Sequence, residues 1–215
     1  MTATAMPTSP LRLPDSYGYT VDDLHAIPED GRRYELIDGS IIVSPSATLD
    51  HNTIAFWLAG LLWDSNPGDE YVVGTDQSAN VDDHNEPRPD IVVARVRNLL
   101  RSPFPIDDAV LVGEVVSPSS GLRDRVTKRE LYAAAGVQSY WLVEPDDRQP
   151  TISLTEFRLG PGGTYARVAD RVTGAFRTDA PWPLEIDLAA LTERRARLIR
   201  LAGGERFTDQ PPASE

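Results

Sequence analysis

Hydrophobic residues recur along this chain with two different periods. Between residues 50 and 66 the apolar side chains follow the spacing i, i+3, i+4, i+7 and i+8, which is one face of a helix, and Asp50 is expected to be its N-cap. Two other segments, 90–94 and 109–116, are apolar almost without interruption, as in strands that are covered on both faces. The pattern therefore predicts buried strands and an amphipathic helix in one chain.

Turn and cap residues divide the rest of the chain into further elements. Thr20, with Asp23 three residues later, resembles the capping box of a short helix. Asp38-Gly39 joins two apolar-rich segments and is a strong signal for a β-hairpin. Residues 124–135 contain no helix breaker, and Gly136 is expected to end that helix. Further strands are expected at 70–75, 139–145, 151–159 and 164–170, with a weaker one at 77–83 and a last helix at 188–201.

The length and composition fit one cytoplasmic domain. A chain of 215 residues can form one sizeable core and is too short for two. We expect a single domain at 19–201, between a flexible arm at 1–18 and a flexible tail at 202–215. The chain has no cysteine, which excludes disulfides and cysteine-based zinc sites. It has neither a signal-peptide pattern nor an apolar run approaching the ~20 residues of a membrane span, so we expect no membrane partner.

The net charge of -12 argues against broad electrostatic binding to nucleic acid. It does not exclude a nuclease, because acidic metal ligands add negative charge and a local basic cluster can still contact phosphate. Such a cluster is present at Arg123, Arg125, Lys128 and Arg129. The alternative is that these residues form the solvated face of a helix.

Two carboxylates fall in the buried-looking strands. Asp90 begins the first of them and Glu114 lies inside the second. A carboxylate in such a strand costs free energy unless it is paired, hydrogen-bonded or bound to a metal. Carboxylates on adjacent strands could share one Mg²⁺, which takes oxygen ligands and keeps several waters.

Lys128 is the only lysine, since the other 20 of the 21 basic residues are arginine. An ammonium is a compact point charge, whereas a guanidinium is a broad fork, so this position could require lysine. Asp124, Lys128 and Tyr132 are spaced by four residues and share one face of the expected helix. The alternative is a routine Asp124–Lys128 ion pair with Tyr132 at the edge of the core.

Two more residues are weaker candidates. Glu35 lies in the apolar segment YELI and could be a further carboxylate of the same site, or an outward-facing polar position on a half-covered strand. His51 lies near the start of a helix, where a neutral histidine more often packs or caps than acts as a base.

Several motifs together resemble the Uma2 family. They are YELIDG followed by Ser-Pro and His51, PDIVV, EVVSPS, the D-x-x-x-K-x-x-x-Y run from Asp124 to Tyr132, and AGVQSYWLVEP. Their order and spacing cover roughly residues 20–190. The family is similar to the PD-(D/E)XK nucleases, which have the restriction-endonuclease-like fold.

The resemblance implies an α/β core with a central mixed sheet flanked by helices, here with an added N-terminal helix and β-hairpin. It implies Asp90 and Glu114 as ligands of a divalent metal, with help from the carbonyl of Val115. The usual superfamily lysine stands two residues after the Glu, where this chain has Val116. Lys128 matches a lysine that has migrated to the next helix, and Glu35 matches a frequent N-terminal acidic residue.

The function that the resemblance implies is a DNA endonuclease that depends on Mg²⁺ or Mn²⁺. Lys128 would orient or deprotonate the attacking water, and Asp124 and Tyr132 would position Lys128. Replacing Lys128 with alanine is expected to abolish cleavage and leave the fold intact. A homodimer is expected, because two symmetric sites cut both strands of a duplex most simply. The alternatives are a nuclease-fold binding module without useful turnover and, with less support, an acid–base hydrolase with paired carboxylates.

Overall fold

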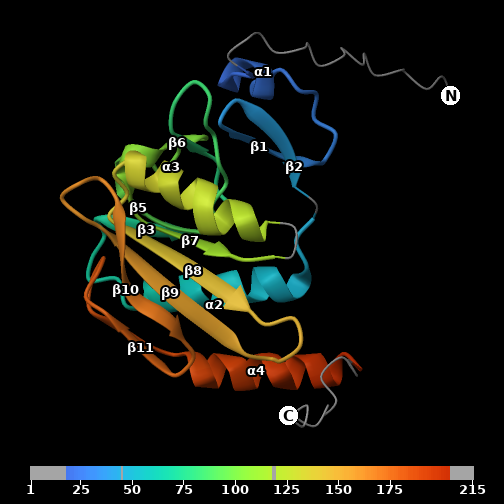
Figure 1. Ribbon diagram of the computed structural model, residues 1–215, viewed down its shortest axis with the longest axis vertical. Helices are drawn as coiled ribbons and strands as arrows, with labels where there is room; N and C mark the ends of the chain where they lie inside the picture. Colours follow the sequence, from blue (N-terminus) through green and yellow to red (C-terminus); the bar gives the residue numbers. More distant parts are fainter. Residues whose placement is uncertain (1–17, 45, 118–119, 204–215) are drawn as a thin grey trace, which may run out of the picture.

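A mixed six-stranded sheet forms the centre of the protein (Figure 1). The computed structural model describes residues 18–44, 46–117 and 120–203. The strand order is β10-β9-β8-β7-β5-β3. Its strands are β3 (Tyr71–Gly74), β5 (Ile91–Arg95), β7 (Ala109–Val115), β8 (Ser139–Pro145), β9 (Ile152–Leu159) and β10 (Tyr165–Val172). β7 and β8 pair in parallel and the other neighbours pair antiparallel, which confirms the expected α/β fold with a mixed sheet.

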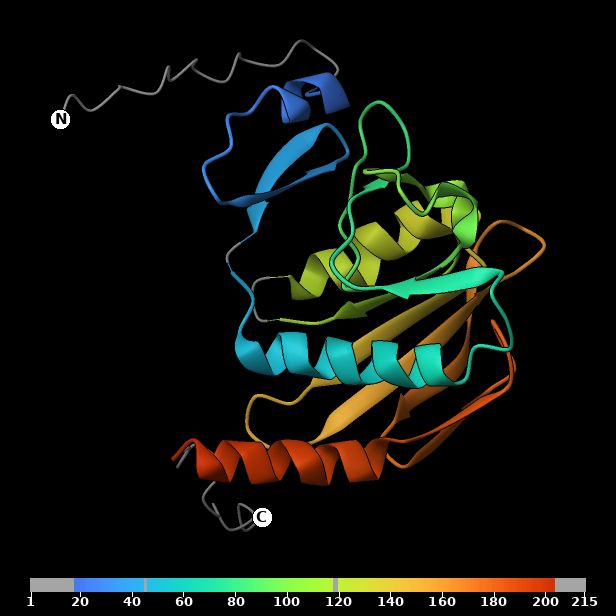
Figure 2. The ribbon, with the colours of Figure 1, turned by 180° about the vertical axis from the view of Figure 1, so that it is seen from behind.

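Helices cover both faces of this sheet (Figure 2). One face is covered by α2 (Leu49–Asp64), α4 (Leu188–Leu201) and the hairpin of β11 (Ala175–Thr178) and β12 (Leu184–Asp187). The other face carries the π-helix η3 (Arg123–Lys128), which continues into α3 (Arg129–Ala134). The short parallel pair of β4 (Ala79–Asn80) and β6 (Phe104–Pro105) lies on this second side.

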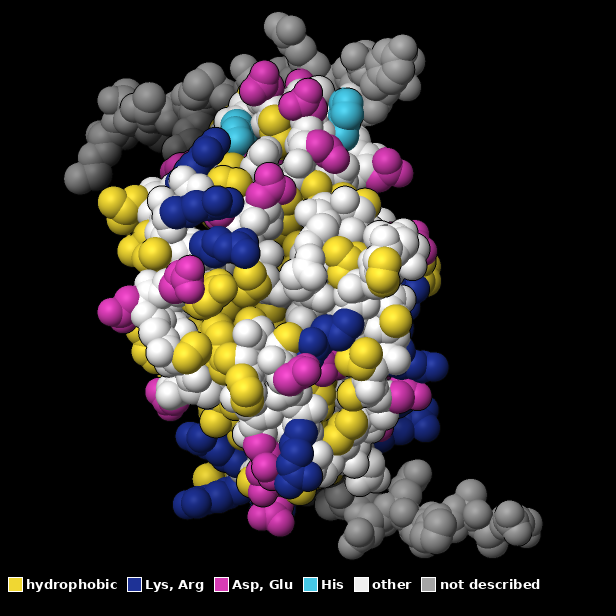
Figure 3. Space-filling view, turned by 90° about the vertical axis from the view of Figure 1, so that its left-hand side faces the viewer, with side chains coloured by type: hydrophobic (Ala, Val, Ile, Leu, Met, Phe, Trp, Pro, Cys, Tyr) yellow, Lys and Arg dark blue, Asp and Glu magenta, His cyan; other side chains and the backbone are white. Residues whose placement is uncertain are grey.

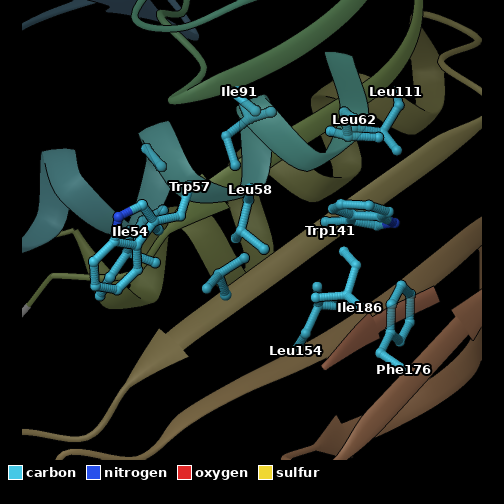
Figure 4. Packing of buried hydrophobic residues seen from close by; sticks show 14 of the residues in the cluster. Ile54, Trp57, Leu58, Leu62, Ile91, Leu111, Trp141, Leu154, Phe176 and Ile186 are labelled. Atoms are coloured by element: carbon cyan, nitrogen blue, oxygen red, sulfur yellow. The ribbon is translucent and has the colours of Figure 1, made fainter. Parts of the chain in front are cut away.

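Large side chains fill the layer between the sheet and α2 (Figure 4). Leu58 and Leu62 of α2 are fully buried against it. The ring of Trp141 from β8 meets Phe176 of β11 edge-on, with 5.5 Å between the ring centroids. Each such side chain contributes about 2 kcal/mol to the free energy of unfolding by leaving water. This packing stabilises the positions of β5, β7 and β8 in the sheet.

The N-terminal part forms the added helix and hairpin. Thr20 and Asp23 cap α1 (Val21–His25) reciprocally, which confirms the predicted capping box. β1 (Arg33–Ile37) and β2 (Ser40–Ser44) pair antiparallel across Asp38 and Gly39, whose φ angles of 48° and 66° fit the predicted tight turn. The backbone of Leu36 exchanges two hydrogen bonds with that of Glu86, which fixes β1 beside the loop that leads into β5.

The structure differs from the sequence-based expectations in three places. The N-cap of α2 is Thr48, whose hydroxyl accepts the N–H of His51, whereas Asp50 lies in the first turn and pairs with Arg195. The helix expected at 124–135 begins as a π-helix, and the hairpin β11–β12 was not predicted. Short 3₁₀ turns, η1 (Val96–Asn98) and η2 (Ile106–Asp108), separate β5 from β7.

The expected arm at 1–18 and tail at 202–215 lie outside the described residues, apart from Gly18, Ala202 and Gly203. Across the described ranges, no helix has both the length and the apolar character that crossing a membrane requires.

Candidate active site

The two predicted metal ligands lie on neighbouring strands. Asp90 directly precedes β5 and Glu114 is the sixth residue of β7, and these strands pair with Ile91 opposite Gly113. The Oδ2 atom of Asp90 accepts the N–H of Val115 at 2.7 Å. This hydrogen bond orients the Asp90 carboxylate toward the end of β7, beside Glu114.

Lys128 joins three separate parts of the chain. Its Nζ lies 2.7 Å from Oε1 of Glu35 and 3.1 Å from Oε1 of Glu114. The lysine side chain is only 4% exposed. The structure therefore brings Glu35, a weaker candidate in the sequence, into direct contact with the site. The ion-pair partners of Lys128 are these two glutamates. The alternative interpretation, a routine ion pair of Lys128 with Asp124, is therefore wrong.

Other groups fix the two glutamates. Glu35 accepts the backbone N–H of Arg88 at 2.8 Å and the hydroxyl of Ser44 at 3.1 Å. The Tyr132 hydroxyl donates to Oε1 of Glu114 at 3.0 Å. Tyr132 is fully buried and does not line the cavity described below, so it acts by holding Glu114.

The π-helix η3 brings Asp124 and Lys128 inward together. Both side chains are buried, whereas Arg125, Val126 and Thr127 between them are exposed. A π turn holds about one residue more than an α turn, and such turns are frequent at functional sites. The wide turn lets two charged side chains four residues apart face the same strands.

Burial and mutual repulsion shift the acidic groups. Burial raises the pKa of Glu114 well above its ordinary value, and the neighbouring carboxylates add to this against the opposing effect of Lys128. Burial likewise raises the pKa of Asp124 to about 6. Burial would also raise the pKa of Glu35, but the ion pair with Lys128 outweighs it and lowers the value. Burial lowers the pKa of Lys128, and the surrounding carboxylates more than reverse this, so the ammonium stays charged.

His51 and Asp90 both contact the backbone of Val115. Its Nε2 is 2.8 Å from the carbonyl oxygen of Val115 and 3.3 Å from Oδ2 of Asp90. Burial lowers the pKa of His51, but the hydrogen bond and the charge of Asp90 raise it overall. His51 is therefore part of the site and not merely a cap, and at this position it donates to the carbonyl that was expected to help bind a metal.

These residues open onto a cavity of about 690 Å³. Its basic lining residues are Arg33, Arg88, Arg123, Lys128 and Arg195. Both Arg33 and Arg88 contact Asp76, and Arg195 binds Asp50 through both carboxylate oxygens. Neither the motifs nor the hydrophobic pattern indicated Arg33, Asp76, Arg88 or Arg195 as residues of the site. Of these four, only Arg88 lies next to a predicted site residue in the sequence, since it directly precedes Pro89-Asp90.

The donor set fits a hard divalent cation in its chemistry, although the ligands are not preassembled. Among the residues that the structure describes, no three His, Asp or Glu side chains form a group that could already hold a metal. Three carboxylates, those of Glu35, Glu114 and Asp124, nevertheless surround one ammonium, and Asp90 adds a fourth negative charge near Glu114. Neither oxygen of Asp124 has a hydrogen-bond partner within the described ranges, although Ser120 is close enough to lower its pKa. This surplus of buried negative charge would be offset by a divalent ion.

The burial of Lys128 corrects one expectation from the sequence. Removing its side chain would leave two buried glutamates without their counter-charge, which is strongly destabilising. The expectation that Lys128→Ala leaves the fold intact therefore conflicts with the structure, and the stability of such a variant has to be measured beside its activity.

The fold is similar to that of a solved nuclease structure. A crystal structure described as "a putative nuclease belonging to DUF820", from Anabaena variabilis, matches with a TM-score of 0.64 and 18% sequence identity. The match covers 82% of this chain and 98% of that one. The model of the Uma2 family, described as "Putative restriction endonuclease", matches residues 21–190, and the chain belongs to this family. No curated protein matches the sequence.

Proposed function

We propose that this protein is a divalent-metal-dependent DNA endonuclease whose catalytic residues are Asp90, Glu114 and Lys128. The observation that carries the proposal is the contact of the buried Lys128 ammonium with both Glu35 and Glu114, one strand away from Asp90. A buried cluster of this kind costs folding free energy, which favours a role in chemistry over one in stability.

Asp90, Glu114 and the carbonyl of Val115 would hold Mg²⁺ or Mn²⁺. When bound, the ion would polarise a phosphoryl oxygen and lower the pKa of a water molecule. The carbonyl of Val115 already accepts the Nε2–H of His51, and its second lone pair would be the one available to the ion. The neutral imidazole could itself bind a transition metal such as Mn²⁺.

Lys128 acts in this proposal as a fixed positive charge and not as a base. Its raised pKa keeps the ammonium protonated at neutral pH. An ammonium has three N–H groups, and Glu35 and Glu114 engage two of them. The third can donate to a phosphate oxygen of the substrate and stabilise the charge that develops there. Tyr132 and Asp124 position the groups that contact the substrate.

A nuclease-fold binding module remains the second candidate. The net charge is -12, and on the face drawn in Figure 3 basic and acidic side chains are interspersed, without one continuous basic patch. Such a surface suits a protein that does not hold long DNA by electrostatics alone.

Calorimetric titration with Mn²⁺ and Mg²⁺ separates the two candidates. The nuclease proposal predicts stoichiometric binding by the wild type and a large loss of affinity in Asp90→Asn and Glu114→Gln. Asp76→Asn is the matched control, because Asp76 lines the same cavity beside Arg33 and Arg88. A wild type that binds neither metal would favour the binding module.

A further inference from the structure

The outer face of α2 carries large apolar side chains that nothing in the described residues covers. Leu49, Phe56 and Trp63 are 83%, 70% and 57% exposed. Thr53 and Gly60, which lie near the same line along the helix, are uncharged and partly exposed. Single exposed apolar residues are common, but three that are aligned on one helix mark an interaction surface.

The helix α2 already buries its opposite face in the core, so the exposed row of Leu49, Phe56 and Trp63, here called the stripe, is additional apolar surface. Ile54, Leu58 and Leu62 are fully buried against the sheet. The guanidinium of Arg194 on α4 lies 4.7 Å from the ring centroid of Trp57. The apolar residues on the other sides of α2 therefore pack within the chain, and among its described large apolar side chains Leu49, Phe56 and Trp63 are the exposed ones.

The stripe is self-complementary. Its members are seven residues apart, which is close to two full helical turns, so they lie in one row about 21 Å long. Phe56 is midway between Leu49 and Trp63. A two-fold axis beside Phe56 would place the same helix of a second copy antiparallel to the first. Phe56 would then meet its own equivalent, and Leu49 would meet Trp63 at both ends, as in an isologous interface.

We infer that a second copy of this chain binds here, through antiparallel packing of α2 against α2. The exposed parts of the three side chains amount to on the order of 450 Å² in each copy, or about 900 Å² in the pair. A specific interface needs about 1,000 Å² in total, and the polar residues flanking the stripe supply the remainder.

The charges that flank the stripe are complementary under the same symmetry. Asp64, Asp69 and Glu70 are exposed at and beyond the C-terminal end of α2. Along the N-terminal half of α2 runs α4, held there by the Arg195–Asp50 ion pair. Its exposed arginines are Arg194, Arg197 and Arg200. Antiparallel packing brings each acidic end to the partner's basic helix, whereas parallel packing would set like charges side by side.

The absence of cysteine from the chain allows a direct test, because each introduced thiol is unique. Phe56→Cys is expected to form a disulfide-linked dimer under mild oxidation, and a mixture of Leu49→Cys and Trp63→Cys is expected to cross-link to each other in preference to themselves. Leu100→Cys is the matched control, since Leu100 is 99% exposed and lies outside α2. Cross-linking of Leu100→Cys that equals that of Phe56→Cys would overturn the inference.

Sedimentation equilibrium supplies a second, independent test. The wild type is expected to dimerise, and Phe56→Glu is expected to weaken dimerisation by about 100-fold or more, because two charges would meet at the axis. Leu100→Glu should leave dimerisation unchanged, and circular dichroism checks that both variants are folded. A wild type that stays monomeric at every concentration, or a dimer that Phe56→Glu does not weaken, would refute the inference. Neither test depends on nuclease activity.

Discussion

Replacing Lys128 with methionine should show how much its ion pairs with Glu35 and Glu114 contribute to the free energy of unfolding. Methionine retains most of the buried length of the side chain and removes the charge. In the wild type the ammonium contacts Glu35 at 2.7 Å and Glu114 at 3.1 Å, and all three side chains are buried. Breaking a buried ion pair by removing one partner costs about 3–5 kcal/mol. Since the two glutamates can take up protons in the variant, we expect a loss near the lower end, about 3 kcal/mol at pH 8.

The loss should depend on pH in a defined direction. In the wild type the pKa of Glu35 is lowered, so its stabilising effect is present above the unfolded pKa and is lost as the pH falls through the folded pKa. Without Lys128, burial would raise the pKa of both glutamates, and the variant would gain stability as they protonate on acidification. The difference between wild type and variant should therefore shrink from pH 8 to pH 5.

Urea unfolding at both pH values measures this difference. Arg129→Met is the matched control, because Arg129 is the next residue and its guanidinium lies over the Phe157 ring, 5.2 Å from its centroid, with no ion pair to a described residue. We expect the control to cost under about 1 kcal/mol at either pH. If Lys128→Met cost no more than this control, or cost the same at both pH values, the argument from buried charge would be wrong.

Three further substitutions test other parts of the site. Asp124→Asn should stabilise the fold by about 1–3 kcal/mol at pH 8 and by about half as much at pH 5, since a carboxyl whose pKa is raised from 3.8 to about 6 on folding destabilises increasingly as the pH rises from the unfolded to the folded pKa; thermal unfolding at the two pH values measures this. Arg195→Lys should cost about 2–3 kcal/mol in urea unfolding, because one ammonium cannot replace contacts to Asp50 and to the carbonyls of Asp146, Gln149 and Thr151. Gly113→Ala should cost about 1–2 kcal/mol in the same assay, because the new Cβ would lie 3.3 Å from Cβ of Ile91, and an unchanged midpoint would show that the strands can move apart.

Much of the fold could be predicted from local patterns. The apolar runs that became β5, β7 and β8 were visible because strands covered on both faces need no polar alternation. The last helix was predicted at 188–201, the range of α4. The hairpin β11–β12 was missed, because its strands have four residues each and lie in a proline-rich segment.

The sequence was enough to predict most of the residues of the candidate site, but not which of them contact one another. Glu35 is 93 residues from Lys128 in sequence, so their ion pair depends on how the N-terminal hairpin packs against the sheet. His51 reaches the carbonyl of Val115 in the same way, through the position of α2. Asp50 and Thr48 are both residue types that favour the N-cap position; the structure has Thr48 as the cap and Asp50 paired with the distant Arg195. These contacts depend on tertiary packing, which cannot be derived from the spacing of residues along the chain.

The most direct test of the central claim is cleavage of DNA by the purified protein. Supercoiled plasmid and single-stranded DNA would be incubated with Mg²⁺ or Mn²⁺, with and without a chelator, beside Glu114→Gln and the control Asp76→Asn. The account predicts nicking that requires the metal, is lost in Glu114→Gln and survives in Asp76→Asn, with all three proteins folded. Metal-dependent nicking by Glu114→Gln at the wild-type rate would contradict the account, and so would a folded, metal-binding wild type that cleaves neither DNA.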